Sequence, residues 1–185
     1  MTGARRAVFL DRDGTLNVEK HYLYRSGDWE WIAGAPEAIR EINEMGWLAV
    51  VVTNQSGVAR AYYTEADVTA LHRHVDQLLA AAGAHIDGYY ICPHHPEAGA
   101  SEGCDCRKPE PGMLLRAADE LGIDLGASYM VGDKAIDIEA AQRAGVTPML
   151  VRTGYGAAQS STLPASILRA ADVLAAVRMI RGQTL

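Results

Sequence analysis

The stretch Phe9-Leu10-Asp11-Arg12-Asp13-Gly14-Thr15-Leu16-Asn17 places two acidic residues, one position apart, directly after the apolar run 7–10. Four apolar residues before a glycine turn indicate a short buried strand. In open α/β sheets, ligands bind in the crevice outside the carboxyl ends of the strands. We therefore expect Asp11 and Asp13 to face a crevice at the end of a strand.

The carboxylates of Asp11 and Asp13 should lie close together, because every second side chain of an extended chain points to the same side. They repel each other unless one is protonated or a cation lies between them. Hard oxygen ligands of this kind suit Mg2+. A solvated turn is the alternative interpretation, since Asp, Gly and Thr are common turn residues.

Composition excludes some classes of function. With 17 basic and 23 acidic residues among 185, the formal net charge is −6, whereas proteins that bind nucleic-acid phosphates carry a basic excess. The apolar run near the N-terminus is too short for a signal-peptide core, and no stretch is long enough to span a membrane. We expect one domain over 1–185, in a cytoplasmic and monomeric enzyme without nucleic-acid or membrane partners.

Helical and strand patterns alternate along the chain. This alternation predicts an α/β fold of three layers, a Rossmann-like parallel sheet with helices on both faces. The expected strands are 7–10, 47–52, 87–91, 128–131 and 147–151, with a further possible strand at 171–174 before a last helix. The expected helices are 35–45, 64–82, 111–121 and 135–144.

Polar residues follow the second and fourth of these strands. Thr53, Asn54, Gln55 and Ser56 follow the second strand and could hold phosphate oxygens, although such residues are also ordinary in turns. The fourth strand leads into Asp133, Lys134 and Asp137. Asp137 alone could be explained by its favourable position at a helix N-terminus.

Two other segments add candidate residues. Arg107 and Lys108 form a pair of cations beside two prolines, where they could bind a polyanion or simply be solvated. The polar and aromatic segment 17–31 has no clean period and could be a flap over the site or a plain surface excursion. Its candidate residues are Glu19, Lys20, His21 and Tyr22.

Four motifs, in order, resemble those of the haloacid dehalogenase (HAD) superfamily of phosphatases: D-x-D-G-T at 11–15, Thr-Asn at 53–54, Lys-Pro at 108–109 and G-D-x-x-x-D at 132–137. The stretches Cys-Pro-His-His-Pro at 92–96 and Cys-Asp-Cys-Arg-Lys-Pro at 104–109 narrow the resemblance to the zinc-containing branch that lacks a cap domain. That branch includes enzymes that dephosphorylate a heptose bisphosphate and enzymes that dephosphorylate histidinol phosphate. The flap and the stretches 51–57 and 128–134 favour the heptose bisphosphate enzymes.

The residue types in the stretches 92–96 and 104–109 also indicate a metal site. Cys92, His94, Cys104 and Cys106 offer three thiolates and one imidazole, a closed tetrahedral set suited to structural Zn2+. One-residue spacing within each pair is tighter than in most zinc motifs, and free buried cysteines are the alternative. Within this zinc loop, 92–108, His95 is expected to be a neighbour of the ligands and not a ligand itself, because four ligands complete the shell.

The resemblance implies a mechanism. Asp11 would be the nucleophile that forms an aspartyl phosphate, and Asp13 the general acid and then the general base. Mg2+ would be held by the carboxylates of Asp11 and Asp133 and by the backbone carbonyl of Asp13, with Asp137 orienting this shell. Thr53 and Lys108 would stabilise the charge on the phosphoryl oxygens.

The resemblance also implies a substrate, the 7-phosphate of D-glycero-D-manno-heptose 1,7-bisphosphate, in the synthesis of nucleotide-activated heptose for lipopolysaccharide or related glycans. Histidinol phosphate is the alternative substrate, and a phospholigand-binding module without turnover is the alternative from another class. The expected substrate-binding residues are Asp11, Arg12, Asp13, Glu19, Lys20, His21, Tyr22, Thr53, Asn54, Gln55, Ser56, Arg107, Lys108 and Lys134.

Overall fold

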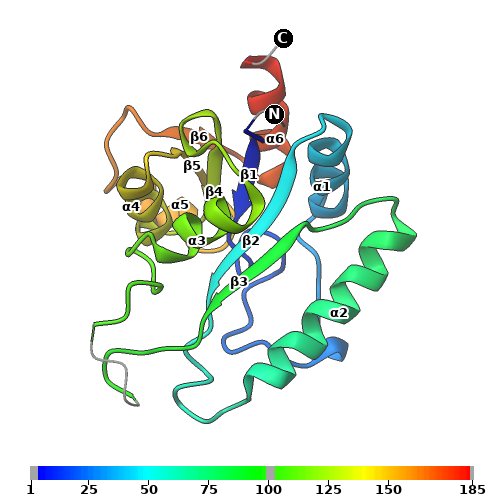
Figure 1. Ribbon diagram of the computed structural model, residues 1–185, viewed down its shortest axis with the longest axis vertical. Helices are drawn as coiled ribbons and strands as arrows, with labels where there is room; N and C mark the ends of the chain where they lie inside the picture. The colour runs from blue at the N-terminus through cyan, green and yellow to red at the C-terminus, as the bar shows by residue number, and fades with distance from the viewer. Residues whose placement is uncertain (1–3, 99–102, 184–185) are drawn as a thin grey trace.

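A single parallel sheet forms the centre of the computed structural model, which describes residues 4–98 and 103–183 (Figure 1). Within these residues, six strands lie in the order β3-β2-β1-β4-β5-β6. Because the chain runs outward from β1 to β3 and then returns to the other side of β1 with β4, the crevice of this fold is expected beside the end of β1. The strands are β1 (Ala7–Leu10), β2 (Leu48–Asn54), β3 (Gly88–Cys92), β4 (Tyr129–Gly132), β5 (Thr147–Val151) and β6 (Leu168–Ala170).

Helices cover both faces of the sheet, so the predicted three-layer α/β fold is confirmed (Figure 1). One apolar layer joins the sheet to α1 and α6, and the other joins it to α3 and α4. The α-helices are α1 (Ala35–Glu44), α2 (Glu65–Ala81), α3 (Gly112–Leu121), α4 (Ala135–Ala144), α5 (Gly156–Gln159) and α6 (Val173–Gln183), and the 3-10 turns are η1 (Ser26–Asp28) and η2 (Leu125–Ala127).

Strand β1 is buried on both faces. Val8 and Leu10 pack in the layer of α1 and α6, whereas Ala7 and Phe9 pack in the layer of α3 and α4. All four residues are inaccessible to solvent, and burial stabilises a side chain such as Phe or Leu by roughly 1.5–3 kcal/mol relative to exposure. This burial holds the residues that follow β1 in one place.

The start of α2 agrees with the sequence. The Thr64 side chain accepts a hydrogen bond from the backbone N–H of Asp67, and the Asp67 carboxylate accepts one from the backbone N–H of Thr64. Each bond satisfies a backbone donor that the helix leaves without an internal partner. Asp therefore serves here in place of the more usual Glu or Gln.

The strand that was expected at 171–174 is wrong. The last strand, β6, lies just before it and pairs with β5, and Asp172 instead precedes the helix α6. The Asp172 carboxylate accepts a hydrogen bond of 2.8 Å from the backbone N–H of Ala175, which is the bond of a helix N-cap. The acidic residue before an apolar stretch was the signal for a helix start.

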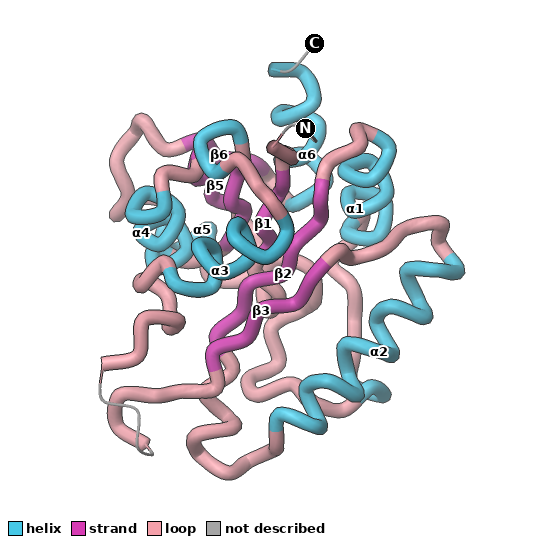
Figure 2. Tube along the Cα trace, in the orientation of Figure 1, coloured by secondary structure: helices cyan, strands magenta, loops and turns pink. Residues whose placement is uncertain are grey.

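Long connections gather where β1, β2 and β3 end (Figure 2). They include the flap that follows β1, the segment between β2 and α2, and the loop between β3 and α3. The expected zinc loop includes residues 99–102, which lie outside the described residues. Among the described helices, none combines the length and apolar character required to cross a bilayer.

Candidate active site and metal centre

Three buried carboxylates meet at the edge of the sheet beside the end of β1. Asp11 follows β1, Asp133 follows β4, and Asp137 lies in the first turn of α4. One oxygen of each lies within 4.8 Å of the others. The parallel pairing of β1 with β4 places the ends of both strands side by side, so the expected proximity of Asp11 and Asp133 is confirmed.

Asp133 has the surroundings of a cation ligand. Its Oδ2 accepts a hydrogen bond of 2.8 Å from the backbone N–H of Tyr155, whereas its Oδ1 is buried and has no hydrogen-bond partner. Burial, together with the charge of Asp11, raises the pKa of Asp133 to about 8. A buried carboxylate oxygen without a hydrogen bond, with Lys134 Nζ 4.0 Å away, fits a bound cation, which would satisfy it without a proton.

Two glycines leave the space that Asp133 occupies. A Cβ atom at Gly14 or at Gly154 would lie 2.3 Å or 2.1 Å from Asp133 Oδ2, and both glycines have positive φ, +87° and +54°. The Thr153 hydroxyl donates a hydrogen bond of 2.7 Å to the carbonyl of Gly14 and ties the two turns together. Position 14, in the first motif, therefore needs a glycine because the Asp133 side chain, from the last motif, fills the space beside it.

Lys108 is the cation of this cluster. Its Nζ lies 2.9 Å from Asp11 Oδ1 and 2.7 Å from Asp137 Oδ1, and it donates to the carbonyl of Val52. Although burial alone would lower the pKa of Lys108, the two carboxylates raise it above its ordinary value. The Asn54 side chain accepts from the backbone N–H of Lys108 and donates to its carbonyl, both at 3.1 Å, so Asn54 fixes where Lys108 enters the site.

The Asp13 carboxylate makes a separate set of contacts. It accepts hydrogen bonds from Arg12 at 3.0 and 3.2 Å, from Asn17 at 3.0 Å and from Gln55 at 3.1 Å. Although burial alone would raise its pKa, the Arg12 guanidinium and these hydrogen bonds hold the pKa of Asp13 below its ordinary value. These donors orient the Asp13 carboxylate, which is not a member of the cluster of Asp11, Asp133 and Asp137.

Two side chains do not lie where the sequence interpretation places them. Arg12 was expected to bind the substrate, but its side chain is turned inward behind Asp13 and is almost completely buried. Lys20 pairs with Glu30 at 3.0 Å and does not line the cavity described below. A substrate in this cavity could meet Arg12 only through its backbone.

Most of the other expected substrate-binding residues line a cavity of about 300 Å3 that includes Asp13. Asp11, Thr53 and Lys108 are buried and do not belong to its lining. Thr53 is buried next to this lining, and its hydroxyl accepts a hydrogen bond of 2.9 Å from the lining residue Gln55 through Nε2. Arg107 is held by a hydrogen bond of 3.1 Å to the carbonyl of His94. The lining includes Glu19, His21, Tyr22, Asn54, Gln55, Ser56, Arg107 and Lys134.

The flap reaches this cavity at His21 and Tyr22, which have φ values of +48° and +51°. Non-glycine residues in this region cost free energy and are concentrated at functional sites. The Glu19 carboxylate accepts a hydrogen bond of 2.9 Å from the backbone N–H of His21 and lies 3.4 Å from Lys134 Nζ. The flap is thus anchored to the residue that follows Asp133.

A second cluster lies in the loop after β3. Cys92, His94, Cys104 and Cys106 each offer one ligand atom, and all four atoms lie within 4.8 Å of one another. Adjacent pairs of these atoms are 3.0 to 3.9 Å apart, whereas a tetrahedral shell with bonds of about 2.3 Å has edges of roughly 3.8 Å. The donor set and its compactness fit Zn2+ and leave no position for water.

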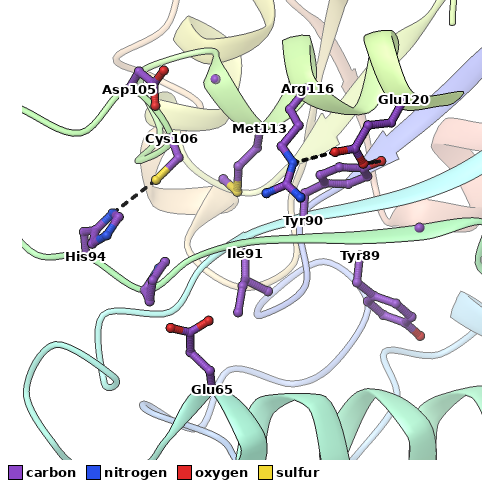
Figure 3. Close-up of a pocket in the computed structure, with 13 residues that line it drawn as sticks. Glu65, Tyr89, Tyr90, Ile91, His94, Asp105, Cys106, Met113, Arg116 and Glu120 are labelled. Atoms are coloured by element: carbon purple, nitrogen blue, oxygen red, sulfur yellow. Dashed lines mark hydrogen bonds and ion pairs between the residues drawn. The ribbon is translucent and has the colours of Figure 1, made fainter. Parts of the chain in front are cut away.

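A larger cavity, about 630 Å3, lies elsewhere, along the open edge of β3. Figure 3 shows His94 and Cys106 at one end of it and Tyr90 with Arg116 and Glu120 toward the other. Arg116 pairs with Glu120 at 2.7 Å. Asp13 and Lys134, which are neighbours of the clustered carboxylates in the sequence, line the smaller cavity and not this one, so cavity size alone would misplace the site.

Sequence reasoning missed Tyr63. Its hydroxyl donates a hydrogen bond of 2.7 Å to Gln55 Oε1, so that the Gln55 amide nitrogen faces Asp13. A Cβ atom at Gly57 would lie 2.2 Å from the Tyr63 ring. The sequence contained a possible signal, since a glycine soon after a strand end often marks a close approach.

The HAD-hydrolase-like family matches residues 105–178, a segment that contains Lys108, Asp133 and Asp137. The fold and the cluster of carboxylates define a phosphoric monoester hydrolase of the HAD superfamily.

Curated relatives are similar over most of their length. The D-glycero-beta-D-manno-heptose-1,7-bisphosphate 7-phosphatase of Yersinia pestis is 51% identical over 158 residues, 83% of this chain and 84% of the relative. The enzyme of the same name from Escherichia coli (strain K12) is 53% identical over 152 residues, 80% of each chain. This chain belongs to the family of heptose-1,7-bisphosphate 7-phosphatases.

A solved structure agrees with this assignment. The D,D-heptose 1,7-bisphosphate phosphatase from B. bronchiseptica, complexed with magnesium and phosphate, has a TM-score of 0.88 and 33% identity, covering 96% of this chain and 99% of that protein. The expected HAD fold is confirmed by this likeness.

Proposed function

We propose that this protein hydrolyses the 7-phosphate of D-glycero-β-D-manno-heptose 1,7-bisphosphate in a Mg2+-dependent reaction that passes through an aspartyl phosphate. The observation that carries the proposal is the proximity of the carboxylates of Asp11 and Asp133. The buried Oδ1 of Asp133 has no hydrogen-bond partner and lies 4.0 Å from Lys134 Nζ. The choice of the β-anomer rests on the names of the curated relatives. The product would supply the synthesis of nucleotide-activated heptose for lipopolysaccharide or related glycans.

The carboxylates of Asp11 and Asp133 and the backbone carbonyl of Asp13 would hold Mg2+. When bound, Mg2+ offsets the negative charge of the phosphoryl group as the Asp11 carboxylate approaches it. Asp137 would orient these ligands indirectly. Its carboxylate pairs with Lys108 and accepts a hydrogen bond of 3.0 Å from the backbone N–H of Lys134. These contacts fix Lys108 and the start of α4.

The reaction would proceed in two displacements. First, an oxygen of Asp11 bonds to phosphorus, the bond between phosphorus and the sugar oxygen breaks, and Asp13 gives that oxygen a proton. Second, Asp13 takes a proton from water, the water oxygen bonds to phosphorus, and the bond to Asp11 breaks to release inorganic phosphate. Lys108 and Thr53 would stabilise the charge on the phosphoryl oxygens during both steps.

Asp13 must gain a proton before it acts as an acid. Its ion pair with Arg12 favours the carboxylate when no substrate is bound. A phosphate dianion nearby would raise the pKa of Asp13, because a neighbouring like charge disfavours the ionised form. Binding of the substrate would therefore prepare the acid, and loss of the sugar would leave a base.

The rim of the cavity favours a second phosphate over an amine. Arg107 and Lys134 place two cations at this rim, where they would attract the 1-phosphate and, together with His21, Tyr22 and Ser56, orient the sugar. Histidinol phosphate, the alternative substrate, has an ammonium group in place of a second phosphate, and like charges repel it from these cations. The same catalytic residues would serve either substrate.

The test is a comparison of kcat/KM for the β- and α-anomers of heptose bisphosphate and for histidinol phosphate. We expect the β-anomer to have the highest value and histidinol phosphate the lowest. A higher value for histidinol phosphate would contradict the proposed substrate. No phosphate release from any phosphate ester would favour a binding module without turnover.

We further propose that the four-residue cysteine and histidine cluster binds structural Zn2+. Burial raises the pKa of the Cys92 thiol, so that thiol would lose its proton only when the metal replaces it. Cys106 immediately precedes Arg107, and Arg107 donates to the carbonyl of the ligand His94. Zinc would thereby hold Arg107 at the rim of the cavity.

Removal of zinc with a chelator should increase protease cleavage between residues 92 and 108 and raise KM for the bisphosphate at saturating Mg2+. The physical reason is that Arg107 loses its fixed position when the loop is released. Limited proteolysis and steady-state kinetics measure both effects. Restoring Zn2+ should reverse them, and a zinc-free protein with unchanged KM and protease resistance would contradict the role of zinc.

We propose a monomer as the active unit. A cytoplasmic location remains our expectation for an enzyme of this kind.

A further inference from the structure

The Arg12 guanidinium lies at a buried junction between the site, the flap and α2. Although the residue stands between two proposed catalytic acids, only 1% of it is exposed. It contacts Asp13, the carbonyl of Leu23 and the ring of His72. The proposed mechanism gives this side chain no step, yet burying a charge requires good compensation.

One edge of the guanidinium, formed by Nε and Nη2, meets Asp13. Nε lies 3.2 Å from Asp13 Oδ2, and Nη2 lies 3.0 Å from Oδ1 and 2.9 Å from Oδ2. Arg has five donors in a rigid planar fork, which matches a carboxylate and fixes its plane. The ammonium of a lysine could neutralise the same charge without fixing that plane.

The flap is bonded to the same guanidinium. Nη2 also donates a hydrogen bond of 2.9 Å to the carbonyl of Leu23. The next residue, Tyr24, stacks on Tyr63 with ring centroids 5.1 Å apart. Tyr63 donates to Gln55, which itself donates to Asp13. Two routes thus join adjacent flap residues to the Asp13 carboxylate.

The remaining nitrogen of the Arg12 guanidinium, Nη1, faces His72 on α2. Nη1 lies 3.5 Å from His72 Nε2. Burial, and then the nearby Arg12, lower the pKa of His72 to about 3, so the ring is neutral and this nitrogen can accept. His72 stacks on Tyr89 of β3 with centroids 4.2 Å apart, and the Tyr89 hydroxyl donates to Asp76 at 2.7 Å. These contacts fix the position of Arg12 relative to the sheet and to α2.

We propose that Arg12 is a positioning residue that holds Asp13 in the plane required for proton transfer and that this plane is set by the docked flap. The inference deepens the proposed function, since it rests on Asp13 being the general acid and base. The Arg12 side chain lines neither the cavity beside Asp13 nor the cluster of carboxylates. By orienting Asp13, Arg12 would speed proton transfer to the leaving oxygen in the first step and from the attacking water in the second.

The test uses the dependence of the rate on the leaving group. A sugar or other alkyl oxygen needs a proton from Asp13 in order to leave, whereas nitrophenolate leaves without one. Arg12→Lys should lower kcat for the sugar phosphate by about 10- to 100-fold with KM nearly unchanged, a part of the 10²- to 10⁴-fold typical of general acid–base catalysis. The burst of nitrophenolate from nitrophenyl phosphate, which reports only formation of the phosphoenzyme, should fall far less.

Variants at His72 separate positioning from folding. His72→Gln keeps an acceptor for Arg12 and should retain most of the activity, whereas His72→Leu removes it and should repeat the pattern of Arg12→Lys with a smaller loss. Arg73→Lys, at the exposed neighbour on α2, is the matched control. An Arg12→Lys protein that keeps its full rate on the sugar phosphate would overturn the inference. So would an equal loss in the nitrophenolate burst.

Failure of the proposed function gives a different result. If the wild type hydrolysed other alkyl phosphates but not heptose bisphosphate, the proposed substrate would be wrong. The comparison of alkyl with nitrophenyl phosphate in Arg12→Lys would still decide the role of Arg12.

Discussion

Replacing Asp11 with Asn should reduce turnover of heptose bisphosphate by at least about 10⁴-fold, in line with the loss of other catalytic nucleophiles. The amide keeps the shape of the side chain and one oxygen, but it cannot form the acyl phosphate. The variant should therefore still bind the substrate and should form no phosphoenzyme. Phosphate release and acid-quench trapping of the phosphoenzyme measure the two outcomes.

Asp119→Asn provides the control for this change, since Asp119 is an exposed acid on α3. It should keep the activity of the wild type. Substantial turnover by Asp11→Asn, after deamidation is excluded by mass spectrometry, would remove Asp11 from the role of nucleophile.

Replacing Lys108 with Met should lower kcat by about 10² to 10³, the loss typical of removing one group that stabilises the transition-state charge. It should also destabilise the Mg2+-free fold by about 3–5 kcal/mol, because buried carboxylates of Asp11 and Asp137 lose their cation. Mg2+ should restore part of this stability by replacing the missing charge. Chemical denaturation with and without Mg2+ measures that restoration.

Lys20→Met is the matched control for Lys108→Met. Lys20 pairs with Glu30 at a half-exposed position, where ion pairs contribute at most about 1 kcal/mol. A Lys108→Met protein with normal kcat would contradict the catalytic role of Lys108. Unchanged stability without Mg2+ would contradict its role as the cation of the carboxylate cluster.

The sheet and the meeting of Asp11 with Asp133 could be predicted from the sequence. Strands of a parallel sheet end at the same edge, so an acid after the apolar run 7–10 and another after the run 128–131 must come close once those strands pair. The metal loop could be predicted for a related reason. Four ligands within fifteen positions need only a local turn to meet.

The direction of the Arg12 side chain could not be predicted in this way. Its partners include His72, sixty positions away. No local sequence pattern predicts toward which side of a turn an arginine side chain points. One of the donors to Asp13, Gln55, comes from a segment 42 positions away and could not be predicted for the same reason. The wrong strand at 171–174 has a different cause, because the signal that identifies the helix start, Asp172 as an N-cap, is local in the sequence. The short apolar run around Asp172 is equally compatible with a strand.

The most direct test of the account is a crystal structure of the protein with Mg2+ and beryllium trifluoride, which mimics a phosphoryl group bound to an aspartate. We predict beryllium on a carboxylate oxygen of Asp11, with a single Mg2+ bound by Asp11, Asp133 and the carbonyl of Asp13. Beryllium on another residue, or Mg2+ bound away from Asp133, would contradict the claim that these two acids share the cation of a phosphoryl-transfer site.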